Sequence, residues 1–393
     1  MNKFLKSALA VCAIVPCAFT FGACGKKDKH QHTYSDTWSM NETHHWYGDS
    51  CGHGSKLSYT EHDYDNEFDK FCNVCGYDRA EYSVWNGEVP ETKPESFTYD
   101  LNNRHIYIDD ASAFAYFAWK YNMLDEYEAR NTIIEEARNN DTLEAILVKD
   151  ESDVAGENCF KSQYDWTVIL NANIDLDNNT ISPIKNSNFR GFEGQNHIIK
   201  NFTVANSANT ATGLFAVASN NLTSSIGINE FIIKNATITS TNAQPAGIIG
   251  ETNMAINNIH AFDVEIIGLS EYVGTICGRA YDSVTNCSVT NINIEGVGYV
   301  GGIIGKMQAD EGAGALELDN LYVENAKIVN TQEASRAKLG AIVGCVENTS
   351  TRKLDSLTIQ KSNSFKGVVL MTEGFEVEPM IYGINTNGTC IVR

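Results

Sequence analysis

An internal repeat of about 28 residues runs from Ile199 to about residue 360. Apolar residues stand at equivalent places in successive units: Ile199, Ile228, Ile256, Val284, Leu318 and Leu354. A glycine-rich run such as "AGIIG" or "GGIIG" follows in most units. A fixed period of this length predicts a solenoid, because one such unit cannot bury its own apolar face and must stack on its neighbours.

Within each unit, apolar and polar residues alternate in short runs, which is the pattern of β-strands. The alternation changes phase at two places, mostly at asparagine, which tolerates the left-handed backbone of a corner. The first series is Asn201, Glu230, Asn258, Asn286, Asn320 and Ser356, and the second is Asn206, Asn235, Asp263, Asn291, Asn325 and Lys361. Successive units are spaced by 29, 28, 28, 34 and 36 residues. These observations predict a parallel β-helix over residues 164–360, with a C-terminal cap or extra strands over 361–393.

The first 23 residues have the pattern of an export signal. Two lysines precede an apolar run that is too short to span a bilayer. The run ends in "TFGAC", which resembles the lipobox of bacterial lipoproteins, in which the cysteine is lipidated and becomes the first residue. We therefore expect residues 1–23 to be removed, a lipid on Cys24, a basic tether over residues 24–31, and a location at the cell membrane facing outward. The alternative is an ordinary signal peptide cleaved near Ala23.

The charge of the chain limits its partners. Its 393 residues include 29 Lys and Arg against 50 Asp and Glu, a formal net charge of −21. Nucleic-acid binding requires clustered cations, and the sequence has no such cluster, so we expect no nucleic-acid partner. The negative charge suits a soluble exported surface that is kept apart by self-repulsion.

Residues 32–81 form a segment rich in cysteine and histidine. Cys72-x-x-Cys75, followed by Gly76, is the knuckle that holds a metal ion between two thiolates in a tight turn. The predicted zinc ligands are Cys51, His53, Cys72 and Cys75, with His45 and His62 as alternates for the histidine. The zinc would be structural, because a module of about 50 residues is too small for a core of its own. Two alternatives stay open: a disulfide between Cys72 and Cys75, and a His-rich face that is simply solvated.

The same segment, from Gln31 to Arg79, resembles a Cys/His-rich repeat of surface proteins in anaerobic bacteria. The resemblance rests on the "HHW" run, the "SCGH" sequence and the late "CNVCG". Many copies of that repeat carry two cysteines where this chain has Cys51 and His53, so the histidine that completes the site stays open.

The segment before the repeats divides into two parts. Residues 82–103 have the composition of a linker, with two prolines and several charges. A short strand follows, then the helix "ASAFAYFAWKYNM" with Asp110 as its N-cap, and a second helix is predicted for Tyr127–Asn139. We interpret residues 104–163 as a strand and helical cap that covers the open edge of the first repeat.

Three motifs make residues 104–360 similar to bacterial surface proteins with GLUG-type repeats. "IYIDDASAFAYFAWKYN" precedes "WTVILNANIDLDNNTISPI" and "NFRGFEGQNHIIKNFTV", and the glycine-rich runs match the repeats themselves. The chain keeps the family residues Asp175, Leu176, Gly191, Phe192, Gly194 and His197. It departs from the pattern at Glu193 and Asn196. The resemblance implies a right-handed parallel β-helix on the cell surface with an adhesin-like or structural role.

Together these features predict a mainly β, non-catalytic lipoprotein whose β-helix presents a binding or scaffolding surface. The candidate ligands are a glycan and a host or matrix protein. One alternative is a carbohydrate-active enzyme, either a polysaccharide lyase or a hydrolase. A hydrolase needs carboxylates on adjacent units, and Asp319 and Asp355 share a place in the repeat. The second alternative is metal capture by the His-rich module.

Overall fold

The computed structural model describes residues 31–41, 43–52, 54–64, 71–100, 103–124, 166–184, 189–206, 209–219, 225–309, 315–331, 338–348, 357–372, 375–386 and 390–392. The chain is mainly β, as predicted, with long sheets of parallel strands and, among the described residues, one α-helix. It forms two compact units, Met1–Glu81 and Tyr82–Arg393. The helix of the described ranges falls short of the length and apolar character of a membrane span.

In the unit Met1–Glu81, three antiparallel strands form a small sheet: β1 (Tyr34–Met40), β2 (His44–Asp49) and β3 (Lys56–Glu61). Aromatic rings pack across it, and Trp38 stacks on Tyr47 with ring centroids 4.0 Å apart. Within the described residues of this unit, only His45 and Cys72 are buried, at 2% and 3% exposure. The described part of the unit therefore has no extended apolar core, and the chemistry around these two residues must help to hold it together.

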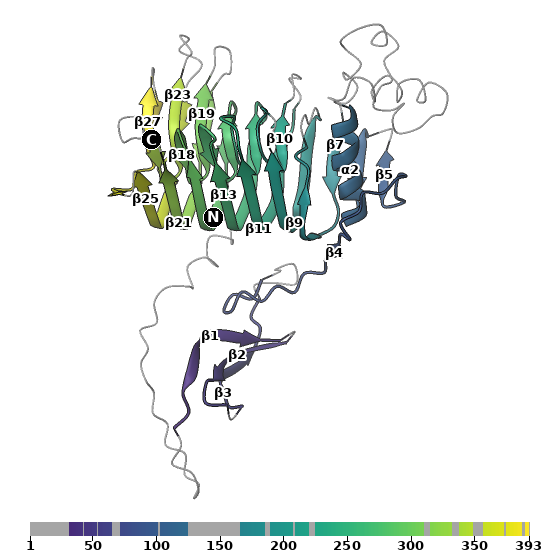
Figure 1. Ribbon diagram of the computed structural model, residues 1–393, viewed down its shortest axis with the longest axis vertical. Helices are drawn as coiled ribbons and strands as arrows, with labels where there is room; N and C mark the ends of the chain where they lie inside the picture. The colour runs from purple at the N-terminus through teal and green to yellow at the C-terminus, as the bar shows by residue number, and fades with distance from the viewer. Residues whose placement is uncertain are drawn as a thin grey trace, which may run out of the picture. The chain divides into compact units, whose positions relative to one another are not determined.

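The unit Tyr82–Arg393 is built from strands that pair in parallel with the equivalent strands of the next repeat (Figure 1). The parallel strands of the largest sheet include β7 (Thr167–Leu170), β9 (Gly191–Asn206), β11 (Gly227–Ser240), β13 (Ile256–Gly268), β17 (Ser288–Gly296), β21 (Tyr322–Asn330) and β25 (Ser364–Thr372). A second sheet contains β10 (Phe215–Ala218), β12 (Ile249–Thr252), β15 (Cys277–Ala280), β19 (Ile304–Ala309), β23 (Val343–Asn348) and β27 (Tyr382–Thr386). A third contains β14 (Tyr272–Gly274), β18 (Tyr299–Gly301) and β22 (Lys338–Gly340). Four short strands pair in order beside the largest sheet: β16 (Val284–Thr285), β20 (Leu316–Asp319), β24 (Leu357–Ile359) and β28 (Cys390–Val392).

In the middle of this strand stack the predicted register is confirmed. Four of the leading apolar residues lie opposite one another on successive strands and are fully buried: Ile228, Ile256, Val284 and Leu318. A second buried column consists of Ile238, Ile266, Ile294, Ile328 and Leu370. Like side chains stacked over like bury a continuous apolar core along the repeats.

At both ends of the strand stack the predicted register is wrong. Ile199 lies opposite Ile233, five residues later than predicted. Leu318 lies opposite Ile359, whereas its predicted partner, Leu354, lies outside the described residues. The spacings at these two places are therefore 34 and 41 residues rather than 29 and 36. The end repeats have longer connections, so apolar residues from different positions of the repeat had been aligned with one another.

The corners have the backbone conformation that the sequence predicted. The first series, with φ between 53° and 59°, is Glu230, Asn258, Asn286 and Asn320, and the second, between 52° and 57°, is Asn235, Asp263, Asn291 and Asn325. Side chains bond along the second series, since Asn291 Nδ2 donates to Asp263 Oδ1 at 3.1 Å and Asn325 Nδ2 to Asn291 Oδ1 at 3.3 Å. Gly367, with φ of 62°, takes the next place, for which the sequence predicted Lys361.

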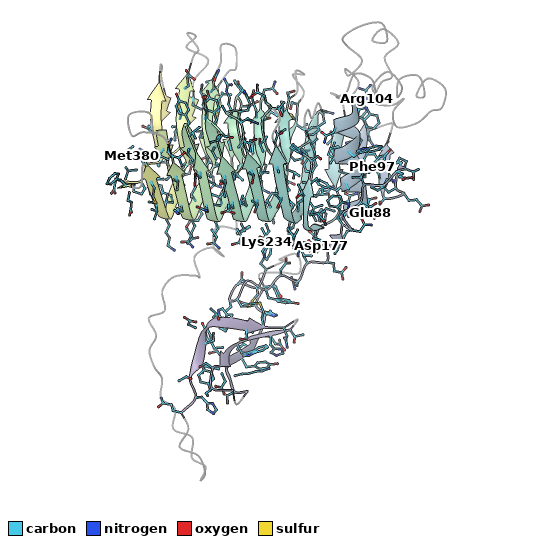
Figure 2. The ribbon with its side chains drawn as sticks, viewed as in Figure 1. Glu88, Phe97, Arg104, Asp177, Lys234 and Met380 are labelled. Atoms are coloured by element: carbon cyan, nitrogen blue, oxygen red, sulfur yellow. The ribbon has the colours of Figure 1, made fainter. Side chains whose placement is uncertain are left out.

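Antiparallel strands form both ends of the largest sheet. At one end β5 (Phe97–Asp100) pairs with β6 (His105–Ile108), which lies beside β7. At the other end β26 (Phe375–Val377) pairs with β25, so the strands continue beyond the predicted boundary at residue 360. Phe97 and Met380 mark the two ends in Figure 2. An antiparallel edge interrupts the parallel pattern that another chain could extend.

The helix α2 (Ala111–Leu124) packs at the β5 end of the unit (Figure 1). Asp110 caps it as predicted, because Ala113 N donates to Asp110 Oδ1 at 2.7 Å. The rings of Phe114 and Phe117 are fully buried in the apolar core. The second predicted helix, at Tyr127–Asn139, lies outside the described residues.

Residues 82–103, for which the sequence predicted a linker, contribute to the second unit. β4 (Ser83–Val84) pairs in parallel with β8 (Ile174–Ile181). Trp85 belongs to the apolar core, and its Nε1 donates to Glu88 O at 2.8 Å. Burial of this ring outweighs the proline content of the segment, which had favoured a linker.

Candidate metal centre

Two strands and one turn bring four side chains together in the unit Met1–Glu81. They are His45, His62, Cys72 and Cys75. His45 lies in β2 and His62 directly follows β3, and the antiparallel pairing of these strands brings the two histidines near one another. The cysteines belong to a tight turn, in which Gly76 N donates to Cys72 O at 2.9 Å. Gly76 has a φ of 72°, a conformation that favours glycine.

The ligand atoms of these residues surround a common centre and all lie within 4.8 Å of one another. His45 Nδ1 and His62 Nδ1 are 3.4 Å apart. Cys75 Sγ lies 3.3 Å from His62 Nδ1, and the distance from Cys72 Sγ to His45 Nδ1 is 3.8 Å. Zinc bonds of about 2.0 Å to nitrogen and about 2.3 Å to sulfur, at tetrahedral angles, give separations of roughly 3.3 Å for N···N and roughly 3.6 Å for N···S. The observed distances fit a tetrahedral metal ion.

The other ring nitrogens of the two histidines have partners of their own. His62 Nε2 lies 2.7 Å from Asn41 O, which only accepts, so this nitrogen carries the proton and Nδ1 keeps its lone pair. His45 Nε2 lies 3.0 Å from Thr60 Oγ1, a hydroxyl that can accept in the same way. The His62 ring also stacks on Tyr77, with centroids 4.4 Å apart. Such contacts orient metal-binding histidines and fix their tautomer.

The protonation of the four residues favours a cation at the centre. Burial acts to raise the pKa of Cys72, but backbone N–H groups of the turn and of Asp63 outweigh it and lower this pKa to about 7. Burial and the neighbouring Cys72 raise the pKa of Cys75 to about 11, so the two sulfurs resist being charged together. Burial and the nearby histidines lower the pKa of His45, which keeps its ring neutral. A cation between the sulfurs would relieve their repulsion, and neutral imidazole is the form that binds metals.

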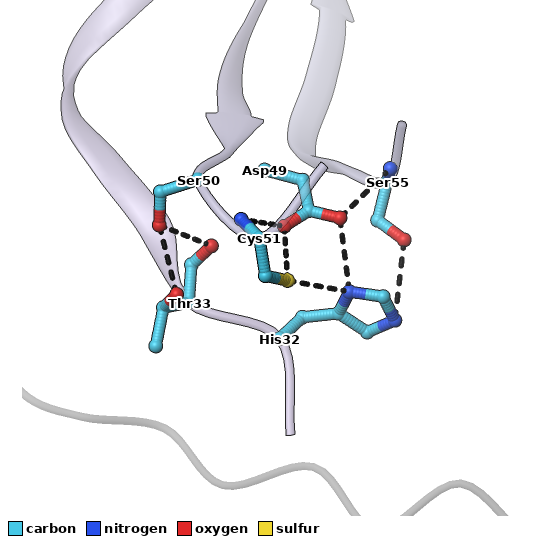
Figure 3. A network of polar contacts seen from close by, with 6 residues as sticks. All are labelled: His32, Thr33, Asp49, Ser50, Cys51 and Ser55. Carbon is cyan, nitrogen blue, oxygen red and sulfur yellow. Dashed lines mark hydrogen bonds and ion pairs between the residues drawn. The ribbon is translucent and has the colours of Figure 1, made fainter. Parts of the chain in front are cut away.

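The structure brings together two predicted ligands and both alternates: Cys72, Cys75, His45 and His62. Cys51 lies in a separate group with His32 and Asp49 (Figure 3). The reason is the direction of β2, because Cys51 follows its C-terminal end whereas His45 lies near its N-terminal end. His53 lies outside the described residues, so its role as a ligand stays a prediction.

The remaining predicted sites are only partly described. Cys24, the expected lipid-attachment residue, and Asp355 lie outside the described residues. In the described part of Tyr82–Arg393, no group of three or more His, Cys, Asp or Glu is arranged as a metal site. Several cations there pair with carboxylates, as Lys366 does with Glu324 at 3.0 Å.

No family model matches the chain, and comparison with curated proteins and with solved structures found no match either. The function must therefore be inferred from the residues and geometry of the chain itself.

Proposed function

We propose that His45, His62, Cys72 and Cys75 hold a structural zinc ion. The observation that supports this most is the agreement between their separations and tetrahedral N₂S₂ coordination. Two imidazoles and two thiolates favour zinc over magnesium or calcium, which take oxygen ligands. The burial of His45 and Cys72 favours a structural role over metal capture, because a capture site needs ligands that solvent reaches easily.

The proposed architecture of the unit Tyr82–Arg393 is a right-handed parallel β-helix of the kind found in surface proteins with GLUG-type repeats. Its support is the order in which the chain visits the sheets. Successive repeats run through β13, β14 and β15, then β17, β18 and β19, then β21, β22 and β23. Each repeat therefore contributes one strand to each of the same three sheets, as one turn of a coil does.

The proposed role of this unit is binding or scaffolding at the cell surface, with Cys24 as the lipid anchor. A polar row on the largest sheet supports it. Equivalent positions on adjacent strands carry Thr237, Glu265, Asn293 and Lys327. Asn293 Nδ2 donates to Glu265 Oε1 at 3.1 Å, and Lys327 is exposed. Polar groups repeated at the strand spacing of about 4.8 Å suit an extended ligand such as a glycan or a segment of a host or matrix protein.

The binding role is tested with the full chain in detergent on arrays of glycans and matrix proteins. We expect saturable binding that Lys327→Ala and Asn293→Ala weaken. Lys361→Ala, which removes an exposed lysine outside the row, should leave binding unchanged. Release of new reducing ends or unsaturated sugars from a polysaccharide panel would contradict the proposal and favour the enzyme alternative.

The anchor is tested separately in cells that process lipoproteins. Labelling with a radioactive fatty acid should mark the wild-type chain, and Cys24→Ala should lose the label and leave the membrane fraction. A chain that stays membrane-bound and labelled after this substitution would refute Cys24 as the attachment residue.

A further inference from the structure

His32, Asp49 and Cys51 form a second group of ligand atoms in the unit Met1–Glu81, at the other end of β2 from His45 (Figure 3). His32 Nδ1 lies 3.0 Å from Asp49 Oδ2 and 3.4 Å from Cys51 Sγ, and Cys51 Sγ also contacts Asp49 Oδ1. A nitrogen, an oxygen and a sulfur thus converge within 4.8 Å of one another. We propose that these three residues bind a second zinc ion and leave its fourth position to water.

The arrangement differs from a nucleophilic triad, which the same residue types could also form. In a triad, the two ring nitrogens of the histidine serve different partners, the nucleophile on one side and the acid on the other. Here Cys51 and Asp49 both contact Nδ1 of His32. No proton can therefore pass through the ring from one to the other, whereas three donor atoms around one point are what a metal ion requires.

The chain holds the three donors in place before any ion binds. Cys51 N donates to Asp49 Oδ1 at 2.8 Å, and Ser55 N donates to Asp49 Oδ2 at 3.4 Å. The far ring nitrogen of His32, Nε2, lies 3.4 Å from Ser55 Oγ. Hydrogen bonds from Cys51, aided by His32 and Ser55, keep the pKa of Asp49 well below its usual range, so a negative charge stays at the site. The Asp49 side chain has 0% exposure, and a buried charge of this kind calls for a positive partner.

The second site differs from the first in access and in the number of protein ligands. The side chain of His32 is 35% exposed and Cys51 is half-buried, whereas His45 and Cys72 are buried. Three protein ligands and one water are typical of zinc sites that keep an open position, and four protein ligands are typical of structural sites. We therefore expect the second ion to be held more weakly and to exchange faster.

Zinc counting on the full chain in detergent tests the proposal. Metal-free, reduced protein is loaded with Zn²⁺, desalted, and analysed for zinc per chain by mass spectrometry. We expect two ions in the wild type and one in Cys51→Ser and in His32→Gln. Asp36→Asn, which changes an exposed carboxylate on the same small sheet, is the matched control and should keep two. A competing chelator added in steps should remove the second ion first.

Three results would overturn the assignment. One ion per wild-type chain would leave only the first centre. Two ions retained in both Cys51→Ser and His32→Gln would place the second ion on other residues. Loss of both ions in His32→Gln would mean that the two groups are a single centre. Loss of the first centre alone is recognised independently, because Cys72→Ser should remove one ion and leave the one that Cys51→Ser removes.

Discussion

Ile266 and Ile267 are neighbours in β13 that face opposite sides of the sheet, and replacing each by alanine tests the direction of the strand. Ile266 has 0% exposure and lies between Ile238 and Ile294, which are also fully buried. Ile267 is 38% exposed. Both substitutions remove the same atoms from the same strand, so differences in β propensity cancel and only the environment differs.

The magnitudes follow from these exposures. An Ile→Ala change removes three carbon groups, worth about 2.4 kcal/mol at roughly 0.8 kcal/mol each when fully buried. At Ile266 a residual cavity adds about 1 kcal/mol, because hydrogen bonds to both neighbouring strands prevent the site from collapsing. At Ile267 the loss is at most about 1.5 kcal/mol, since the side chain is already 38% exposed and leaves no closed cavity. We expect Ile266→Ala to be the more destabilising by about 2 kcal/mol.

Urea unfolding of the full chain, followed by far-ultraviolet circular dichroism, measures this difference. Equal slopes for the two variants would show that the change lies in stability and not in the extent of unfolding. Equal losses, or a larger loss for Ile267→Ala, would refute the register, because a slip of one residue exchanges the inward and outward faces of a strand.

Three further predictions concern other parts of the chain. Chelation of metal under reducing conditions should abolish amide protection in β1–β3 and leave β13 protected in hydrogen exchange, because structural zinc supplies about 10 kcal/mol or more of folding free energy; unchanged protection of β1–β3 would contradict a structural ion. Asn291→Ala should lower the free energy of unfolding by about 1–2 kcal/mol, since φ is 57° there, and Asn291→Gly should lower it less; the reverse order in urea titrations would count against backbone strain. Burial raises the pKa of Asp282 above its unfolded value, so its ionisation destabilises the fold as pH rises through the folded pKa. Asp282→Asn should therefore gain stability relative to wild type between acid and neutral pH, and parallel pH profiles would refute this.

The middle of the repeat was predictable because its local chemistry is strict. Corners at Asn258, Asn286 and Asn320 need a residue that accepts positive φ, and the spacing between these units changes little. The end repeats were not, because apolar residues such as Ile199 fit an incorrect phase as well as the correct one. Only pairing across strands, as between Ile199 and Ile233, decides between the two.

The metal centre shows the same division between local and long-range information. Cys72 and Cys75 lie in one turn, and their spacing alone identifies them as a pair of ligands. Choosing the histidines required the pairing of β2 with β3, which places His45 opposite Thr60. These strands have little apolar alternation from which a register could be derived, so proximity in sequence favoured Cys51 instead.

The two antiparallel edges of the largest sheet have a consequence for how such a protein can change its length. Ile228, Ile256 and Val284 are opposite one another at intervals of 28 residues. An in-frame duplication of residues 256–283 therefore adds one strand to each of the three parallel sheets and leaves β5 and β26 where they are. The unit can grow or shrink from its interior, in steps of about 4.8 Å, while the termini that prevent polymerisation are inherited intact.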